Sequence, residues 1–536
     1  MNSLASAVRR PASTVRGLWC WWRALLSTKP EYASERLVDG VLRVGLALVA
    51  AVTFASIALL AIVHVGDRFE VNQVAGTWFA LAQDLREGVL YRPLFEDGYY
   101  GLSAYMPLQF VVNAAASYLT GEYLVSGKLV AYVSGLSLIV LVFLLLTRSG
   151  CPRLLSFGLI SALLATQTGL VAVLGIHGDT LPLVLQLAGL ALVMHSQSRR
   201  VVAAAAVLCA LAFFTKFTAI WAPIAIAVWL AFRHRKRLAL FLGSLLGSGL
   251  ALAFLFEALS QGRLSDSLVE VMAPGGSASE GSFLAGVSTF FELMIDRAGA
   301  IWLLVPFAVL AVLQAIARRS FTLTQLAFVC ALPIVVVVLG NPGSDFNHLI
   351  DVAALTVLVV GELSAASMRS SSERASLLAA LACIAVILGT LQSYRLALKD
   401  EVSHAVRVAT GRVANAYTTT PLDGLVEPGQ SLLSEDPVIP ILRGERPILL
   451  DGIGLRRLGE RRPDLLADLE HRLATRAFDR VVLINSVDNL RWYEQISMGS
   501  AIRDAIARNY VLLAQIPAPP HEYYWVYAPK GSDNRP

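Results

Sequence analysis

The chain has 536 residues, of which 56% are hydrophobic and only 15% are charged. Soluble domains carry about 25% charged residues, so this composition excludes an ordinary soluble protein. The net charge of +5 is modest, and in a membrane protein it reflects Lys and Arg in cytoplasmic loops rather than a nucleic-acid-binding surface. The five cysteines are scattered without a CxxC pair, which argues against a metal finger or a disulfide framework.

The first 38 residues are basic and precede the first long apolar run. Trp21 and Trp22 lie beside Arg23, a combination typical of a helix at a membrane interface. The apolar run that begins at residue 39 is too long for the core of a signal peptide. We therefore expect residues 1–38 to be a cytoplasmic or interfacial segment and the next run to be an uncleaved first span.

Apolar runs dominate residues 39–393, and many approach the roughly 20 residues needed to cross a bilayer. They cover about 39–63, 105–120, 124–147, 154–175, 180–195, 201–215, 217–232, 238–259, 299–317, 321–340, 347–366 and 375–393. Basic segments place residues 196–200, 233–237, 318–319 and 369–374 in the cytoplasm. Counting twelve full crossings from a cytoplasmic N-terminus disagrees with this placement of the basic segments. We therefore expect that the run 105–120, or one of the two runs around Lys216, does not cross the membrane completely. The pattern predicts an all-α polytopic membrane bundle of about 11–12 transmembrane helices.

Residues 64–104 form an acidic stretch between two apolar runs and are predicted to be the first outer loop. Asp67 and Glu70 are three residues apart just past the first run, so a continuing helix would place both carboxylates on one side. One carboxylate could act as a general base toward an acceptor hydroxyl, while the other could orient that hydroxyl or bind a cation. The alternative interpretation is a solvated helix end.

Three ionisable residues interrupt later apolar runs. Asp179, with His177 two residues before it, lies between two runs, and ionisable groups at membrane depth are costly and usually functional. Lys216 interrupts a long apolar stretch, and a buried ammonium there needs an anionic partner such as a phosphate or a carboxylate. The alternatives are a short interfacial loop for Asp179 and a lysine side chain reaching the membrane surface for Lys216.

The segment 340–351 combines Gly and Pro, which favour a tight loop, with several polar side chains. Asn347 and Asp351 are four residues apart and would share one helical face at the start of a span. Their polar groups could hold sugar hydroxyls. The alternative is that Asp345 or Asn347 caps the helix.

From residue 394 the apolar runs shorten to strand length and the charge rises. The segments predicted to be strands are Leu432–Ser434, Pro447–Asp451, Arg480–Asn485, Val511–Ile516 and Tyr523–Ala528. Amphipathic helical segments alternate with them, so we predict a small α/β extracytoplasmic domain over residues 394–536. No GxGxxG motif and no P-loop occur there.

The order of these motifs resembles one known architecture. After the first span and the acidic loop come Tyr105-Met-Pro-Leu108, Gly175-Ile-His-Gly-Asp179, Phe214-Thr-Lys216 and Gly343-Ser-Asp-Phe-Asn347. This order resembles the GT-C superfamily of integral-membrane glycosyltransferases. It is most similar to the bacterial branch that includes aminoarabinose transferases, protein mannosyltransferases and Rgt-like lipopolysaccharide glycosyltransferases. The resemblance covers most of residues 39–393.

The resemblance implies a bacterial inner-membrane enzyme that is multi-pass, with a cytoplasmic N-terminus and a periplasmic C-terminal domain. It implies transfer of a sugar from a polyprenyl-phosphate donor to a lipid, glycan or protein acceptor, with inversion at the anomeric carbon. The family's acidic first-loop position matches Asp67 or Glu70, although Asp-Arg-Phe-Glu replaces the adjacent acidic pair common in the family.

The other roles implied by the resemblance cover the remaining candidate residues. Asp179 and His177 match a second acidic site, Lys216 and Arg92 would bind the donor phosphate, and Tyr91, Tyr105, Asn347 and Asp351 would bind sugar or acceptor. A divalent cation, if one is used, would be held by Asp67, Glu70 and Asp179. The rival interpretations are a transporter or flippase of a lipid-linked or anionic substrate, a polysaccharide ligase or polymerase, and a catalytically inactive GT-C relative.

Overall fold

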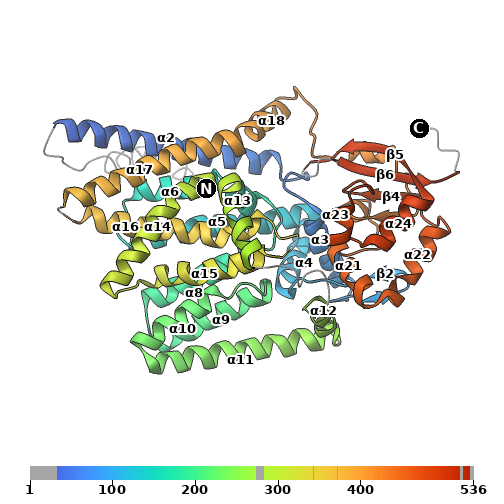
Figure 1. Ribbon diagram of the computed structural model, residues 1–536, viewed down its shortest axis with the longest axis horizontal. Helices are drawn as coiled ribbons and strands as arrows, with labels where there is room; N and C mark the ends of the chain where they lie inside the picture. The colour runs from blue at the N-terminus through green and yellow to red at the C-terminus, as the bar shows by residue number, and fades with distance from the viewer. Residues whose placement is uncertain (1–32, 273–282, 342, 371, 520–522, 532–536) are drawn as a thin grey trace, which may run out of the picture.

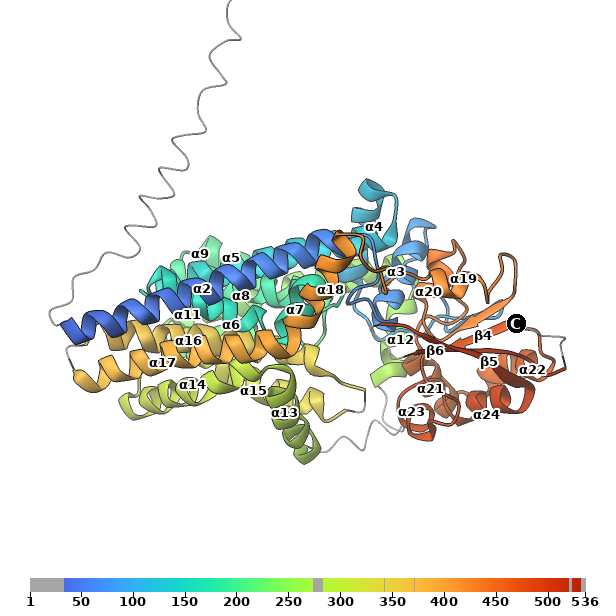
Figure 2. The ribbon, with the colours of Figure 1, turned by 90° about the horizontal axis from the view of Figure 1, so that it is seen from above.

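The computed structural model describes residues 33–272, 283–341, 343–370, 372–519 and 523–531. The predicted interfacial segment around Trp21 and Trp22 therefore lies outside the described residues. Figures 1 and 2 show a long bundle of helices with a smaller part, which contains the strands, at one end. The first outer loop and the C-terminal residues together form that smaller part.

Each of the twelve predicted apolar runs is helical. The helices are α2 (Ala33–Val63), α4 (Pro107–Thr120), α5 (Tyr123–Arg148), α6 (Arg153–Leu164), α7 (Gln167–Leu174), α8 (Thr180–His195), α9 (Arg199–Thr215), α10 (Trp221–Arg233), α11 (Arg235–Ser260), α14 (Gly299–Arg318), α15 (Leu323–Leu339), α16 (Ile350–Met368) and α17 (Glu373–Ser393). Six stretches among the described residues are long and apolar enough to cross a membrane, or seven if bent α6 and α7 form one span. The helices α8, α10 and α15 are shorter and apolar. This is a multi-pass membrane protein with the predicted helical architecture.

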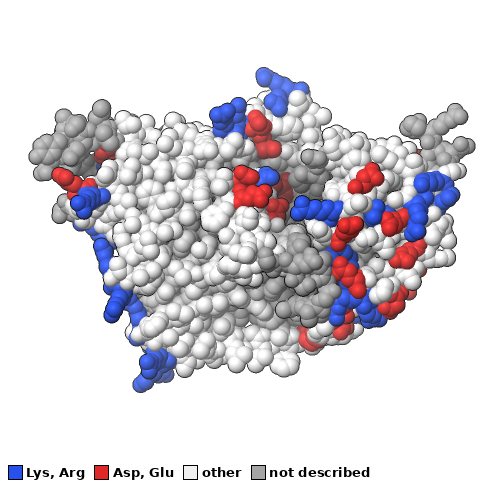
Figure 3. All heavy atoms as spheres, in the orientation of Figure 1, with Lys and Arg blue, Asp and Glu red and all other residues white. Residues whose placement is uncertain are grey.

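The bundle has a buried centre and an apolar outer surface. In the most apolar part of the stretch Phe346–Met368, 83% of the residues are buried, whereas the corresponding figure for α11 is 6%. The exposed side chains of α11 are large and apolar, and they include Leu246, Phe254 and Leu259. Figure 3 shows charged residues over the smaller part, around α13 and α18, and at the far end of the bundle, with a nearly uncharged surface over the rest of the bundle in this view. Such a surface fits contact with lipid rather than water.

A sharp bend separates α6 from α7. The two helices meet at 90°. Thr166 caps α7 by accepting a hydrogen bond from the backbone N–H of Gly169. A Cβ at residue 169 would lie 1.9 Å from the carbonyl oxygen of Leu163, so only glycine permits this close approach. The bend directs the following turn, residues 175–179, toward the smaller part of the molecule.

The first outer loop is largely structured. It contains α3 (Gln73–Arg86), capped by Asn72, and a short hairpin of β1 (Phe95–Glu96) and β2 (Tyr99–Tyr100). Helix α3 packs against α4 and against α20 (Val438–Leu442). The long connection after α11 also contains helices, α12 (Arg263–Met272) and α13 (Phe283–Arg297).

The C-terminal residues form a four-stranded sheet with helices, as predicted. The strand order is β3 (Leu432–Ser434), β4 (Arg480–Leu483), β6 (Tyr523–Pro529) and β5 (Tyr510–Pro517), with β3 and β4 parallel and the other pairs antiparallel. The helical elements after α17 are a π-helical turn η3 (Tyr394–Leu398), α18 (Lys399–Ala409), α19 (Thr420–Asp423), α20, α21 (Gly452–Arg461), η4 (Pro463–Leu466), α22 (Ala467–Ala474), α23 (Leu490–Gln495) and α24 (Ser500–Asn509). Residue 394, where the composition changes, lies within the continuous helical stretch from α17 to α18.

The first outer loop and the C-terminal domain share one core. Tyr100 and Leu102 of the loop belong to the same buried cluster as Leu449 of the domain. The predicted strand Pro447–Asp451 is wrong, because among the described residues it pairs only through one bridge between Leu449 and Tyr100. The backbone N–H of Tyr100 donates to the carbonyl oxygen of Ile448 at 2.9 Å. The C-terminal domain therefore helps to set the position of the loop.

Candidate functional site

Three of the predicted motifs meet at one place, which we call the Asp179 cluster (Asp179, Lys216, Asn347 and His348). The Lys216 ammonium, at the end of α9, forms an ion pair with Asp179, and its Nζ lies 2.8 Å from Nδ1 of His348. Nδ2 of Asn347, in the turn η2 (Phe346–Leu349), donates to Oδ2 of Asp179 at 2.7 Å. Burial alone would raise the pKa of Asp179, but Lys216, His348 and Asn347 together lower it. Asp179 is therefore a buried anion with cationic and amide partners.

Asp351 lies one turn after Asn347, at the start of α16. Its Oδ1 accepts a hydrogen bond from Nε1 of Trp221 at 2.9 Å. Trp221 begins α10, so Asp351 links two helices just beyond the Asp179 cluster. The predicted neighbours Asn347 and Asp351 thus lie at the same end of the bundle, each with a polar partner.

Asp67 is buried and accepts hydrogen bonds from three groups. Nδ1 of His64 lies 2.6 Å from its Oδ2, Nδ2 of Asn415 donates to the same oxygen at 2.7 Å, and the backbone N–H of Phe69 donates to Oδ1 at 2.9 Å. Burial raises the pKa of Asp67, but these hydrogen bonds outweigh it and the net pKa is lowered. Asp67 is thus a fixed, ionised carboxylate. Neither His64 nor Asn415 was among the predicted site residues.

Glu70 has the opposite environment. Burial raises the pKa of its carboxyl to about 7, with the nearby Lys128 opposing this rise and Glu401 adding to it. Within the part of the chain that the structure describes, no hydrogen bond is made to its side chain, which is partly exposed. Its backbone φ of 53° lies in the left-handed region, so the helix does not continue through Glu70 as the sequence suggested.

Lys128 joins the first outer loop to the Asp179 turn. It is fully buried in α5, and its Nζ donates to the carbonyl oxygen of Phe69 and, at 3.3 Å, to that of Leu174. In addition, the backbone N–H of Ile176 donates to the carbonyl oxygen of Glu70 at 3.3 Å. The predicted acidic loop and the predicted second acidic site are therefore adjacent.

Arg92 and the predicted tyrosines have different surroundings. Nε and Nη2 of Arg92 donate to the two oxygens of Asp84 at 2.6 and 3.0 Å, and Nη1 donates to the carbonyl oxygen of Pro447 at 2.7 Å. The buried hydroxyl of Tyr91 donates to the carbonyl oxygen of Tyr105 at 2.8 Å. Arg92 and Tyr91 thus make contacts that hold the loop together.

Tyr105 lies closer to the Asp179 cluster. Its ring packs on Trp78 with a centroid separation of 4.4 Å, and Trp78 in turn lies against Gly178 of the Asp179 turn. Burial raises the pKa of the Tyr105 phenol well above its ordinary value, and the negative charges of Asp451 and Asp179 raise it further. Tyr105 therefore lies between the Asp179 cluster and the C-terminal domain.

We expect Arg92 to contribute to stability rather than to lipid binding. Replacing Arg92 with Met removes the buried cation beside Asp84 and leaves only the more exposed Arg446 in contact with it, which should reduce the free energy of unfolding by about 3 kcal/mol. Arg446, which is 35% exposed and contacts the same carboxylate at 3.2 Å, offers a matched control with an expected loss of about 1 kcal/mol or less. Urea unfolding and binding of a polyprenyl phosphate would be measured together. Lost lipid binding at unchanged stability would contradict this expectation.

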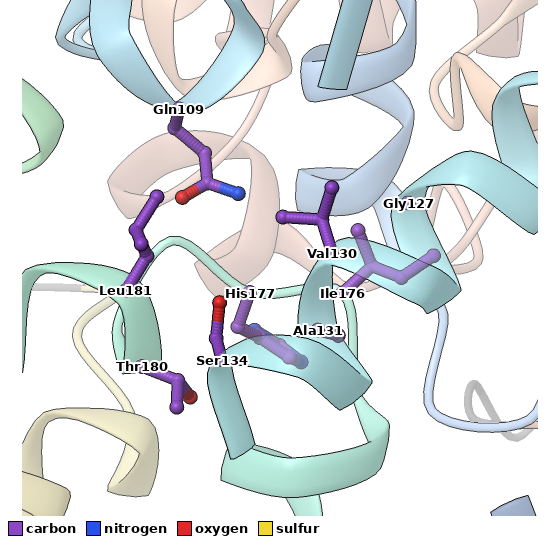
Figure 4. Close-up of a pocket in the computed structure, with 9 residues that line it drawn as sticks. All are labelled: Gln109, Gly127, Val130, Ala131, Ser134, Ile176, His177, Thr180 and Leu181. Atoms are coloured by element: carbon purple, nitrogen blue, oxygen red, sulfur yellow. The ribbon is translucent and has the colours of Figure 1, made fainter. Parts of the chain in front are cut away.

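A small polar pocket lies beside the Asp179 turn (Figure 4). It is lined by Gln109, Gly127, Val130, Ala131, Ser134, Ile176, His177, Thr180 and Leu181. The side chains of Gln109, Ser134, His177 and Thr180 bring polar groups from α4, α5, the turn and the first residue of α8. Burial lowers the pKa of His177, which favours its neutral form. Among these, the sequence had singled out His177 alone.

Two of the three carboxylates considered as cation ligands, Asp67 and Asp179, have other partners. Asp67 accepts bonds from His64, Asn415 and Phe69, and Asp179 from Lys216 and Asn347. Over the described residues, no group of three or more His, Cys, Asp or Glu side chains is arranged to hold a metal ion.

Comparisons with known proteins give a match in structure. No protein-family model matches the sequence, and no curated protein matches it. The crystal structure of ArnT from Cupriavidus metallidurans bound to undecaprenyl phosphate matches with a TM-score of 0.56 at 14% identity, over 91% of this chain and 99% of that chain. The chain has the fold of ArnT. The same protein in the apo state gives a TM-score of 0.54 at 16% identity, over 94% of this chain and 100% of ArnT.

The archaeal oligosaccharyltransferase AglB from Archaeoglobus fulgidus gives a TM-score of 0.47 at 12% identity, over 90% of this chain and 75% of AglB. The likeness to ArnT confirms the predicted polytopic helical fold with a small C-terminal α/β part, and it extends over nearly the whole chain, including most of its C-terminal domain. The roles of the individual site residues stay predictions.

Proposed function

We propose that this protein is a membrane glycosyltransferase that moves a sugar from a polyprenyl-phosphate donor to a lipid, glycan or protein acceptor. The observation that carries the proposal is the adjacency of Glu70 to the Asp179 cluster, through Lys128 and the Ile176–Glu70 hydrogen bond. The backbone of Glu70, whose carboxyl has a raised pKa, is thus bonded to the turn that carries Asp179, the ion-pair partner of Lys216. The matching structure of ArnT, which is bound to undecaprenyl phosphate, supports the choice of donor.

The proposed reaction is a displacement at the anomeric carbon of the donor sugar. Glu70 takes the proton of the acceptor hydroxyl as the acceptor oxygen attacks that carbon. The bond between the carbon and the phosphate oxygen breaks, and polyprenyl phosphate leaves with the electron pair. The Lys216 ammonium stabilises the negative charge on the departing phosphate. Attack from the side opposite to the leaving phosphate inverts the anomeric configuration.

Asp67 has a different role in this proposal. Its two oxygens already accept three hydrogen bonds, and its lowered pKa makes it a weak proton acceptor. We assign it as a fixed negative charge that stabilises positive charge developing on the sugar ring. This assignment separates the two carboxylates, which the sequence left as equal candidates for the base.

The arrangement also suggests a topology in the bacterial inner membrane. With α4 kept at the surface, eleven crossings remain: α2, α5, bent α6–α7, α8, α9, α10, α11, α14, α15, η2–α16 and α17. An odd number of crossings places the N-terminus and the C-terminal domain on opposite sides of the membrane. The basic segments 233–237 and 318–319 then face the cytoplasm with the N-terminus, in agreement with the positive-inside rule. The candidate site lies on the outer face, where a lipid-linked donor is available.

A turnover assay tests the proposed function. The purified protein in lipid nanodiscs would be mixed with a panel of undecaprenyl-phosphate hexoses and pentoses and with a membrane extract as the acceptor source. We expect release of undecaprenyl phosphate from at least one donor, with accumulation of a glycosylated product. Binding of undecaprenyl phosphate without release from any donor would contradict the proposal and favour an inactive relative or a transporter.

A further inference from the structure

The segment that carries both candidate carboxylates is bonded to the C-terminal domain through a buried charged group. We call Arg68, Asp436 and Tyr524 the Arg68 triad. Nη2 of Arg68 donates to Oδ2 of Asp436 at 2.9 Å and also bonds to the Tyr524 hydroxyl, which donates to the same carboxylate oxygen at 2.5 Å. All three side chains are at least 97% buried. Arg68 lies between Asp67 and Glu70, so the triad holds the centre of the segment.

A second set of contacts holds the same segment from the connection between α18 and the domain. Nδ2 of Asn415 donates to Asp67 at 2.7 Å, and the backbone N–H of Arg68 donates to the carbonyl oxygen of Tyr417 at 3.0 Å. Residues that are some 350 positions away in sequence thus contact two consecutive residues of the first loop. These contacts constrain both the side chain of Asp67 and the backbone that follows it.

The backbone of Glu70 gives a reason why such constraint is needed. Its φ of 53° is a conformation that non-glycine residues adopt only when the surrounding structure holds them there. Glu70 is also bonded through its carbonyl oxygen to the N–H of Ile176, next to the Asp179 turn. A segment released from the Arg68 triad would relax to ordinary dihedral angles and would turn the Glu70 carboxylate away from its position.

We propose that the C-terminal domain positions the reacting carboxylates, with Arg68, Asn415, Asp436 and Tyr524 as positioning residues for the transfer proposed above. The proposal rests on that function. A buried ion pair is weak evidence for stability, since well-packed apolar residues often serve a fold as well. The directional hydrogen bonds of the Arg68 triad are instead suited to holding residues 67–70 in one geometry. The domain is then a part of the active site rather than a separate appendage.

The sequence offers matched controls for this proposal. Glu435 is adjacent to Asp436 and equally buried, but its partners, the Trp492 indole at 2.7 Å and the Ile484 N–H at 3.0 Å, lie within the domain. Tyr527 is on the same strand as Tyr524, and its hydroxyl accepts from the N–H of Val487. Glu435→Gln and Tyr527→Phe therefore perturb the domain alone, whereas Asp436→Asn and Tyr524→Phe also affect the first loop.

The test compares these four full-length variants with the wild type in lipid nanodiscs. It measures amide hydrogen exchange over residues 64–71, binding of undecaprenyl phosphate, and kcat and KM with the undecaprenyl-phosphate sugar that the wild type uses fastest. We expect Asp436→Asn and Tyr524→Phe to increase exchange at residues 67–71 and to lower kcat by about 10- to 100-fold, with lipid binding and KM little changed. The two control variants should change neither quantity by more than about twofold.

The possible results distinguish a positioning role of these residues from a purely structural one. They also distinguish failure of the positioning proposal from failure of the proposed function. The positioning proposal would be overturned if Asp436→Asn gave the same exchange and kcat as Glu435→Gln, and Tyr524→Phe the same as Tyr527→Phe. It would also be overturned if the loss of kcat in each variant matched the loss of folded protein. If Asp436→Asn does not fold, Tyr524→Phe, which removes one hydroxyl, decides the result. If the wild type releases undecaprenyl phosphate from no donor, the proposed function fails, and the exchange data alone decide whether the domain positions residues 67–70.

Discussion

Replacing Glu70 with Gln is expected to lower the rate of sugar transfer by about 10²- to 10⁴-fold, the usual contribution of a positioned general base. The amide keeps the size of the side chain but accepts no proton at neutral pH. Undecaprenyl phosphate should still bind, because the phosphate contacts are assigned to Lys216. The measurement is release of undecaprenyl phosphate under single-turnover conditions, beside a lipid-binding measurement on the same preparation.

The pH dependence of transfer follows from the same residue. Glu70 accepts a proton only when it is ionised, and burial raises its pKa to about 7. The rate should therefore be low in acid, rise as the pH passes through about 7, and level off above it. Asp67→Asn should reduce the rate but keep this rise, because the pKa of Asp67 is lowered and its ionisation is complete well below pH 7. A rise near pH 7 that persists in Glu70→Gln and disappears in Asp67→Asn would reverse the two roles.

Stability should change in the opposite direction to activity. The pKa of Glu70 in the folded protein, about 7, exceeds its ordinary value of 4.5, so folding favours the protonated form. Ionisation then destabilises the folded state progressively as the pH rises above about 4.5, and most strongly above 7. Glu70→Gln should accordingly raise the thermal midpoint at pH 8 and leave it nearly unchanged at pH 4. Lower stability at both pH values would indicate that the substitution disrupts packing instead.

The sequence predicted the bundle well because the bilayer imposes one strong rule on a spanning chain. Backbone groups in lipid must be hydrogen-bonded within the segment, so a long apolar run is a helix, and all twelve runs are helical. It also selected Asp179, Lys216 and Asn347, which form one cluster. The signal in each case was a polar residue that apolar surroundings do not tolerate alone. The same signal was present at Lys128, a single lysine within the run 124–147, and it identifies the residue that joins the two halves of the site.

The contacts between the first loop and the C-terminal domain could not be predicted in this way. Arg68 and Asp436 are 368 residues apart, and each occurs among other charged residues, so neither stands out in composition or periodicity. The environment of Glu70 depends on the same long-range packing. An i, i+3 spacing predicted two equivalent carboxylates on a helix, whereas a positive φ and different partners give them unlike pKa values. The pairing of Arg92 with Asp84 likewise depends on how the loop folds and does not follow from composition or periodicity.

Replacing Lys216 with Met is expected to weaken undecaprenyl phosphate binding by about 10- to 100-fold, the value of a hydrogen bond to a charged group. The ammonium has three N–H groups, and its contacts among the described residues are to Asp179 and to Nδ1 of His348. The third N–H remains for a phosphate oxygen, and the side chain is 19% exposed. Transfer should fall further, by about 10²- to 10³-fold, because the same ammonium stabilises charge that develops on the leaving phosphate. Lys216→Arg, which keeps the charge, should retain most of the binding.

A double-mutant cycle separates phosphate binding by Lys216 from its ion pair with Asp179. Lys216→Met alone leaves Asp179 buried without its cation, which should cost about 3–5 kcal/mol of stability. Adding Asp179→Asn removes that unpaired charge and should recover most of the lost stability. If Lys216 contacts the donor phosphate, lipid binding stays weak in the double variant even though the fold is restored, because neither Met nor Asn supplies a cation. If Lys216 serves only to neutralise Asp179, lipid binding returns together with stability, and the phosphate contact must be assigned to another residue.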